Sequence, residues 1–198
     1  MAYDKFTLLR STAVPLPIEN IDTDQIIPAR FLKATTREGF GDNLFRDWRF
    51  NSDATPKKDF VLNDPTYSGK ILVGGRNFGS GSSREHAAWA VYDYGFRCVI
   101  SSFFADIFKG NCLNIGVLPV QVSADFSNKI FAEIDKNPET QIEVNLQEQT
   151  VTLVATGEKE SFEINGYKKD NMLNGFDDID YLMNIKSDIV TFAKNTPL

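Results

Sequence analysis

The clearest pattern of hydrophobic and polar residues lies between residues 70 and 122, where short apolar runs alternate with segments of helical period. The apolar runs predict three buried strands, at residues 71–75, 98–102 and 117–122. Between the strands, residues 84–94 and 103–114 predict helices that Gly95 and Gly116 would end. Because apolar strands joined by helices are typical of parallel sheets, we expect such a sheet at the centre of the fold.

The segments before this centre have a weaker pattern. Residues 6–14 and 20–28 predict extended structure. Residues 30–67 are rich in charged residues, Gly, Asn, Asp and Pro, and they show no clean period. A stretch of this length without regular structure inside a compact domain is usually a functional or disordered loop.

The segments after the centre predict a helix, a meander and a final helix. Residues 124–136 predict the first helix, and apolar and polar residues then alternate at 141–146, 150–154 and 161–164. This alternation predicts an antiparallel meander with one solvated face. The chain closes with a predicted helix at about 178–193, whose apolar face consists of Leu182, Ile185, Ile189 and Phe192.

Composition and charge narrow the class of function. The 198 residues include 27 acids and 21 bases, and this net charge of -6 disfavours a general nucleic-acid binder. The first residues do not resemble a signal peptide and no apolar run is long enough to span a membrane, so we expect a soluble cytoplasmic protein. One histidine, His86, and two cysteines, Cys98 and Cys112, cannot complete a site that needs several His or Cys ligands. We therefore expect no metal in this chain and interpret both cysteines as small buried residues.

The first candidate site is the segment 74–86, which holds four glycines, three serines and two arginines between a predicted strand and a predicted helix. Ligands of open α/β sheets bind where strands end and helices begin, and a helix N-terminus favours anions. Ser82 or Ser83 would be a good N-cap, and Arg84 could clamp a carboxylate or phosphate in a bidentate manner. The segment therefore predicts a site for a small anion.

Other interpretations of this segment stay open. The letters do not match GxxxxGK[ST], GxGxxG or GxSxG, and a Ser83–His86 hydrolase would lack an identifiable orienting group and oxyanion hole. The simplest alternative is a tight turn with an ordinary N-cap, in which Arg84 and Glu85 are solvated charges and His86 has a structural role.

The second candidate site is Asn20–Arg30, which contains Asp22 and Asp24. On a strand, these two carboxylates would point the same way, with Ile26 following on that face. Paired carboxylates can bind a metal or share a proton. The alternative is a local hydrogen-bonding device between side chain and backbone, which is common for Asp in turns.

These two segments are part of a longer set of motifs in a fixed order. The set consists of NIDTDQIIPARFLK at 20–33, REGFG at 37–41, LFRDWRF at 44–50, GSGSSREHAA at 79–88, GFRCVISSFFADIF at 95–108 and NCLNIGVLP at 111–119. Together they resemble the swivelling domain of the aconitase superfamily, and most closely the small subunits of bacterial 3-isopropylmalate dehydratases. The resemblance extends over nearly the whole chain.

The resemblance implies an α/β fold: an aconitase-type swivelling β/β/α domain with a central, mostly parallel sheet flanked by helices, a small antiparallel β segment and a C-terminal helix. It implies a single domain over residues 1–198. Within it, residues 30–67 would be the substrate-selecting loop and residues 177–195 a C-terminal helical extension.

The resemblance also implies a function. Enzymes of this family isomerise 2-isopropylmalate and 3-isopropylmalate through isopropylmaleate in leucine biosynthesis, by removing and re-adding water. A [4Fe-4S] cluster, held by three cysteines of a separate large subunit, acts there as Lewis acid on the departing hydroxyl. The chain is thus expected to be a hydro-lyase subunit that binds no cofactor itself, acts only with the large subunit, and binds a small dicarboxylate but neither nucleic acid nor membrane.

Individual roles follow from the matching positions. Ser82 matches the serine whose alkoxide takes the proton, and Arg84 matches the arginine that clamps a substrate carboxylate, with Ser83 beside them. Asp24 matches an aspartate that orients the substrate or the serine. A helix N-terminus and an adjacent guanidinium would favour the serine anion, since a free hydroxyl is a poor base. Glu85 and His86 are expected to support the site from behind.

Phe31 and Leu32 fall where relatives select their substrates. An aromatic and a leucine suit an isopropyl group, while Lys33 leaves room for a second acid; ordinary core packing is the alternative for both apolar residues. Two other functions stay open: the small subunit of a related hydro-lyase acting on homoaconitate, citraconate or methylmalate, and a stand-alone carboxylate-binding module.

Overall fold

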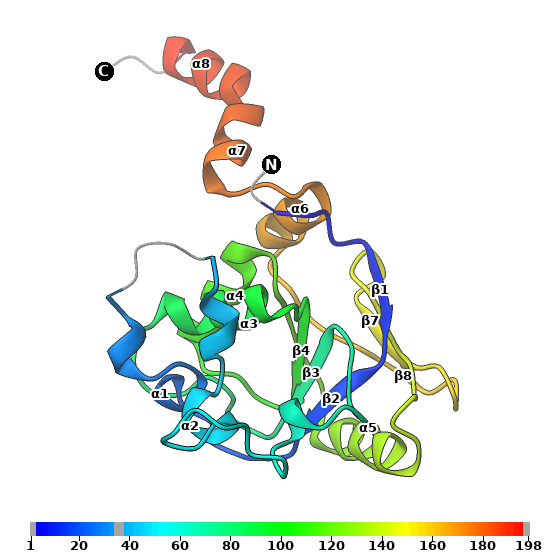
Figure 1. The fold of residues 1–198 in the computed structure, drawn as a ribbon. Coiled ribbons are helices and arrows are strands. Elements are labelled where there is room, and N and C mark those ends of the chain that lie inside the picture. The colour runs from blue at the N-terminus through cyan, green and yellow to red at the C-terminus, as the bar shows by residue number, and fades with distance from the viewer. Residues whose placement is uncertain (1–2, 34–37, 196–198) are drawn as a thin grey trace.

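The computed structural model describes residues 3–33 and 38–195, in which two four-stranded sheets lie at the centre (Figure 1). The first sheet is parallel and has the order β2-β3-β4-β5. Its strands are β2 (Ala13–Leu16), β3 (Ile71–Gly74), β4 (Cys98–Ser101) and β5 (Leu118–Gln121). The predicted parallel sheet is confirmed, and its strands lie within the three apolar runs and at the end of the predicted N-terminal segment.

The two faces of the parallel sheet bury different clusters. Leu72 and Val99 face a cluster shared with α3 (Glu85–Tyr94) and α4 (Asp106–Ile115). Ile71, Val73 and Ile100 face the opposite cluster, shared with α5 (Ala124–Lys136) and the second sheet. Successive residues of a strand point to opposite faces, so a run that is apolar at every position is buried on both sides.

The helices between the strands have the expected ends. Gly95 and Gly116 are the C-caps of α3 and α4, and α5 has the predicted bounds. The start of α4 differs from the prediction, because residues 103–105 are not helical and Phe104 instead forms a bridge with Phe78. Phe104 is 1% exposed, so its apolar character reflects burial under the loop rather than a helix face.

The second sheet is antiparallel and has the order β1-β6-β7-β8. Its strands are β1 (Leu8–Ser11), β6 (Ile142–Asn145), β7 (Thr150–Leu153) and β8 (Lys159–Ser161). The antiparallel meander is confirmed, but the bounds of its third strand are wrong. The strand β8 ends at Ser161, whereas the predicted strand begins there. The pattern also did not reveal that β1 pairs with β6, a contact between residues about 130 positions apart.

The extended structure expected for residues 20–28 is wrong. Residues Thr23–Ile26 form the one-turn helix α1, and Asp22 is its N-cap. The Asp22 carboxylate accepts a hydrogen bond from the Gln25 amide at 2.8 Å, and the Gln25 side chain accepts one from the Asp22 amide at 2.8 Å. This capping box satisfies two backbone donors at once, which stabilises a turn that hydrophobic period alone does not reveal.

Residues 38–67 form short helical turns packed on the core: η2 (Phe40–Asn43), α2 (Arg46–Arg49) and η3 (Val61–Asn63). A further turn, η1 (Ala29–Phe31), precedes them, and residues 34–37 of the predicted 30–67 loop lie outside the described residues. Four buried side chains anchor the segment, namely Phe40, Leu44, Phe45 and Leu62. The segment is therefore irregular, as its composition predicts, but it is held against α3 by an apolar interior.

The end of the chain forms three helices: α6 (Gly166–Asn174), α7 (Asp178–Asn184) and α8 (Lys186–Asn195). The prediction of one continuous helix at 178–193 is wrong, because the chain breaks at Ile185, the C-cap of α7. Of the four residues on the predicted apolar face, Ile185 is partly buried, whereas Leu182, Ile189 and Phe192 are exposed. In Figure 1, α7 and α8 project away from the two sheets.

Candidate active site

The loop that follows β3 lies against the N-terminal segment that leads into α1. The amides of Gly79 and Ser80 both donate hydrogen bonds to the Ile21 carbonyl, at 2.8 and 3.1 Å. In return the Thr23 amide donates to the Ser80 carbonyl at 2.8 Å. These bonds bring the two candidate segments, which lie some 60 residues apart in the sequence, together in one site.

Thr23 fixes the middle of the loop, and its role was not anticipated. Its side chain is 2% exposed, and its hydroxyl donates to the Ser82 carbonyl at 3.0 Å. The capping-box pattern Asp22-x-x-Gln25 is a sequence signal for the helix start that places Thr23 at the first position of α1, but it does not indicate the bond from Thr23 to Ser82. Thr23 thus positions Ser82 through the backbone and leaves the serine side chain unconstrained.

Asp24 and Arg84 form an ion pair between the two segments. Asp24 lies in the first turn of α1, and its carboxylate accepts from Nη1 of Arg84. The side chain of Arg84 is 15% exposed and that of Asp24 is 54% exposed. The idea that Asp22 and Asp24 form a carboxylate pair on a strand is wrong, because Asp22 caps α1 and Asp24 pairs with an arginine.

Ser82 and Ser83 are both exposed beside this ion pair, and neither is the N-cap of α3. The N-cap is Arg84, whose side chain makes no capping bond, so the prediction of a serine cap is wrong. Arg84 has extended backbone angles (φ -120°, ψ 105°), and the helix therefore starts only at Glu85. Both hydroxyls lie just before the positive end of a helix and are open to a ligand.

Glu85 is exposed at the start of α3, whereas His86 is partly buried. Glu85 accepts a hydrogen bond from the indole of Trp89 at 3.1 Å. The His86 ring packs against Trp89 and Phe40, with centroid distances of 4.4 and 5.6 Å. The ring contacts of His86 therefore help to hold α3 against η2, whereas the bond between Glu85 and Trp89 lies within α3. The expected supporting role of both residues at the site stays a prediction.

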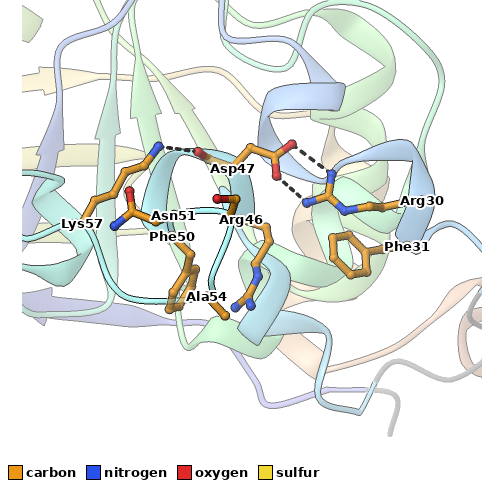
Figure 2. A pocket seen from close by; sticks show the side chains of 9 residues that line it. Arg30, Phe31, Arg46, Asp47, Phe50, Asn51, Ala54 and Lys57 are labelled. Atoms are coloured by element: carbon orange, nitrogen blue, oxygen red, sulfur yellow. Dashed lines mark hydrogen bonds and ion pairs between the residues drawn. The ribbon is translucent and has the colours of Figure 1, made fainter.

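Phe31 and Leu32 are both partly buried against the core, in agreement with the alternative of core packing. Phe31 also lines a cavity of about 520 Å³ together with Arg30, Arg46, Phe50 and Lys57 (Figure 2). Figure 2 shows the Arg30 guanidinium paired with both carboxylate oxygens of Asp47. Hydrogen bonding from Arg30 lowers the pKa of Asp47, which keeps this pair charged. None of the lining residues is Ser82, Ser83 or Arg84, so this cavity is not the anion site itself.

The two cysteines have the buried structural role that we expected. Cys98 in β4 and Cys112 in α4 are both 0% exposed, and burial raises the pKa of each thiol above its ordinary value. Over residues 3–33 and 38–195, no group of three or more His, Cys, Asp or Glu side chains is placed to hold a metal ion. Within the same residues, no helix has the length and apolar character needed to cross a membrane.

The loop requires glycine at position 79. Gly79 has φ +79°, and a Cβ there would lie 2.2 Å from Cγ of buried Phe108. Gly79→Ala should therefore lower the free energy of unfolding by about 2–5 kcal/mol, which combines left-handed strain with overpacking. Gly39→Ala is the matched control, since Gly39 has φ +76° with no atom within 4 Å and should cost only about 1–2 kcal/mol. Urea unfolding of both variants measures the difference, and equal losses would contradict the role of Phe108.

Comparison with known proteins shows which family the chain resembles in sequence. The family model of the aconitase C-terminal domain matches residues 3–125, and the model LeuD_N matches residues 128–166. The 3-isopropylmalate dehydratase small subunit of Cytophaga hutchinsonii is 60% identical over 193 residues, which cover 98% of this chain and 96% of the relative. That of Christiangramia forsetii is 59% identical over 179 residues, covering 90% and 87%.

A solved structure agrees in fold. The crystal structure of 3-isopropylmalate dehydratase (leuD) from Methanocaldococcus jannaschii matches with a TM-score of 0.66 at 23% identity, covering 95% of this chain and 99% of the other. This likeness concerns the fold, whereas the sequence similarity over nearly the full chain shows the family. The chain, whose residues 3–125 match the aconitase C-terminal domain, belongs to the family of 3-isopropylmalate dehydratase small subunits.

Proposed function

We propose that this chain supplies the carboxylate clamp and the base of an active site that a large subunit completes. As a dehydratase small subunit, the chain is part of a hydro-lyase of leucine biosynthesis. The observation that carries the proposal is the Asp24–Arg84 ion pair beside the exposed hydroxyls of Ser82 and Ser83. A cytoplasmic location is inferred from this biosynthetic role.

The substrate of the proposed enzyme is a dicarboxylate, and Arg84 is placed to bind one of its carboxylates. A guanidinium presents two parallel donors to a carboxylate, and Asp24 contacts only one terminal nitrogen of Arg84. The side chain of Arg84 is mostly buried, so its charge is less screened than that of a surface arginine. Asp24 would hold the guanidinium in the orientation that a substrate carboxylate needs.

Ser82 is the proposed base. Dehydration removes a proton from the carbon beside a carboxylate and hydroxide from the neighbouring carbon, which leaves isopropylmaleate. In the proposal, Oγ of Ser82 as alkoxide takes that proton and returns it when water re-adds with the opposite regiochemistry. Arg84 and the start of α3 lie next to Ser82 and favour its negative charge, and Ser83 offers a further donor.

We assign the [4Fe-4S] cluster to the large subunit, because the residues of this chain do not fit it. Both thiols are fully buried with a raised pKa, whereas a cluster ligand must be a thiolate at the site. The single histidine is packed between Phe40 and Trp89. We therefore assign no step of the cluster chemistry to the residues of this chain.

Phe31 and Leu32 are proposed to select the substrate. Phe31 borders the 520 Å³ cavity, where the apolar rings of Phe31 and Phe50 lie beside Arg30, Arg46 and Lys57. The rings suit an isopropyl group. Asp47 also lines the cavity and pairs with Arg30, which leaves Arg46 and Lys57 to attract an additional carboxylate such as that of homoaconitate. This mixed lining makes a related hydro-lyase the second candidate, and a substrate panel separates the two.

Reconstitution tests the proposed function. The isolated chain should not turn over isopropylmalate, and anaerobic addition of the Fe–S large subunit from the same organism should restore turnover. The rate of isopropylmaleate formation, followed by its absorbance, is compared with rates on homoaconitate, citraconate and methylmalate. Turnover by the purified chain alone would refute the divided site. A higher kcat/KM for another acid of this panel would show that isopropylmalate is not the preferred substrate.

A further inference from the structure

The last two helices expose a concentrated apolar surface. We call residues 178–195 the C-terminal arm. Six of its large apolar side chains are 42–72% exposed: Ile179, Leu182, Met183, Ile189, Val190 and Phe192. Within the described chain only four other large apolar side chains are exposed, and they are spread over 100 residues. We call the six side chains the apolar face of the arm, and a cluster of this kind is typical of an interaction site.

The apolar face has helical spacing. Ile179, Leu182 and Met183 lie at positions i, i+3 and i+4 of α7, and Ile189 and Phe192 lie at i and i+3 of α8. Residues with this spacing occupy one side of a helix. An amphipathic helix with such a stripe is suited to an apolar groove on a second protein.

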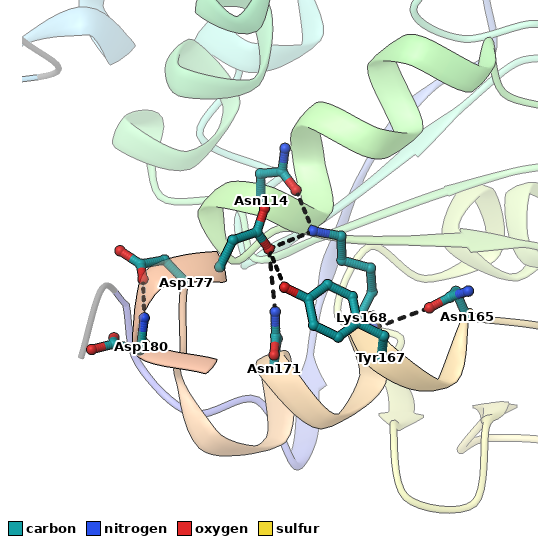
Figure 3. Close-up of polar contacts among 8 residues, drawn as sticks. Asn114, Asn165, Tyr167, Lys168, Asn171, Asp177 and Asp180 are labelled. Atoms are coloured by element: carbon teal, nitrogen blue, oxygen red, sulfur yellow. Dashed lines mark hydrogen bonds and ion pairs between the residues drawn. The ribbon is translucent and has the colours of Figure 1, made fainter. Parts of the chain in front are cut away.

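The base of the arm is fixed to the body by polar contacts (Figure 3). The Asp178 carboxylate accepts hydrogen bonds from Lys168 at 2.8 Å and from the Tyr167 hydroxyl at 2.7 Å. The hydrogen bond from Lys168 lowers the pKa of Asp178, so this contact is charged at neutral pH. The rings of Tyr167 and Tyr181 meet edge to face at 4.5 Å. These contacts set the direction in which the arm leaves α6.

Beyond its base, the arm has little support from the rest of the chain. Every residue of α8 is exposed, and helices of 7 and 10 residues are marginal in water without packing. Packing of the apolar face against another surface would stabilise these two short helices. Residues 3–33 and 38–177 do not provide that surface.

We propose that the apolar face of the arm docks on the large subunit. The proposal rests on the proposed function, in which the large subunit must reach Ser82 and Arg84. A cavity of about 220 Å³ is lined by Glu85, which adjoins Arg84, and by residues 177–179 at the base of the arm. The arm therefore leaves the body beside the helix that carries the carboxylate clamp. A subunit that covers Arg84 therefore also lies close to the arm, so one partner can contact both the clamp and the apolar face.

A triple variant of the full chain tests the arm. Leu182→Ser, Met183→Ser and Phe192→Ser together should weaken the affinity for the large subunit by roughly 100-fold or more, since buried interface anchors dominate binding. Leu8→Ser is the matched control, because Leu8 is 55% exposed on β1 and should leave the affinity unchanged. Titration of activity with the large subunit gives both the apparent Kd and the kcat at saturation, and kcat should stay near that of the unaltered chain.

Amide hydrogen exchange of the unaltered chain provides a measurement that does not depend on the folding of a variant. Residues 178–195 should gain at least about tenfold protection on addition of the large subunit, while β8 should not. Unchanged exchange in the arm, or unchanged Kd in the triple variant, would overturn the docking proposal although the enzyme remained active. A dimer of the chain alone that the triple variant dissociates, with unchanged Kd for the large subunit, would also overturn it in favour of a second copy. Failure of the proposed function is distinguishable, because it abolishes turnover by the unaltered pair.

Discussion

Replacing Ser82 by alanine is expected to lower kcat of the reconstituted enzyme by roughly 10²–10⁴-fold, the usual contribution of a positioned base. The side chain of Ser82 is exposed, and the backbone carbonyl, not the hydroxyl, accepts the bond from Thr23. The substitution therefore removes one oxygen atom and leaves the loop in place. Affinity for the large subunit and the free energy of unfolding should both be unchanged. Initial rates with saturating isopropylmalate, together with urea unfolding, measure the effect.

Ser80→Ala is the matched control within the same loop. The Ser80 hydroxyl lies 3.4 Å from the Ile21 carbonyl and 3.5 Å from the Asn20 carbonyl, so its loss removes only two weak contacts. Its variant should retain most of the original kcat. If Ser82→Ala retained comparable activity, Ser82 would not be the base, and the serine hydroxyl would have to be assigned to substrate binding at most.

The sequence was most informative where structure depends on hydrophobic period. Strands β3, β4 and β5 and helix α5 lie where apolar spacing predicts them, because burial on both faces of a parallel sheet leaves an unambiguous pattern. Pairing between distant segments has no such local signal. The contact of β1 with β6 depends on how the chain returns after α5, which spacing within either strand does not encode.

Two predictions, the extended structure at α1 and the single C-terminal helix, were wrong because the hydrophobic period alone does not determine the local backbone structure. In α1 the decisive interaction is the reciprocal bond between Asp22 and Gln25, which outweighs the extended tendency of the neighbouring Ile and Thr residues. In the arm, residues 178–193 have the period of one helix, but a period does not show whether the chain continues through Ile185. Nor does it distinguish a face buried in the same chain from one that remains exposed.

The residues of the candidate site could be predicted from the sequence, but the contacts between them could not. Glycines, serines and an arginine between a strand and a helix indicate an anion site, and the structure places them at the end of β3. The partner of Arg84 is 60 positions away, and of the two interpretations of Asp22 and Asp24, the paired carboxylates assumed a strand that does not form. Thr23 and its bond to Ser82 could be recognised only once α1 and the loop were seen in contact.

Arg84→Gln is expected to lower kcat/KM by about 10²-fold or more, since the neutral side chain loses the charged, bidentate contact that the mostly buried guanidinium would make with the substrate carboxylate. The loss should appear first in KM, because the clamp binds the carboxylate in the ground state as well as in the transition state. Arg76→Gln is the matched control: it removes the same charge from the same loop, and Arg76 is exposed without a carboxylate partner among the described residues. A similar loss in both variants would indicate a general effect of net charge rather than a clamp.

Combining Asp24→Asn with Arg84→Gln tests whether Asp24 acts through Arg84. If Asp24 acts by orienting Arg84, Asp24→Asn should lower kcat/KM by less than Arg84→Gln does, because a guanidinium without its carboxylate partner still binds the substrate. The double variant should then be no worse than Arg84→Gln alone, since the effects of two residues that act through one contact do not add. Additive losses in this double-mutant cycle would show that Asp24 contacts the substrate or Ser82 independently. Kd for the large subunit, measured in all three variants, separates these effects on catalysis from effects on assembly.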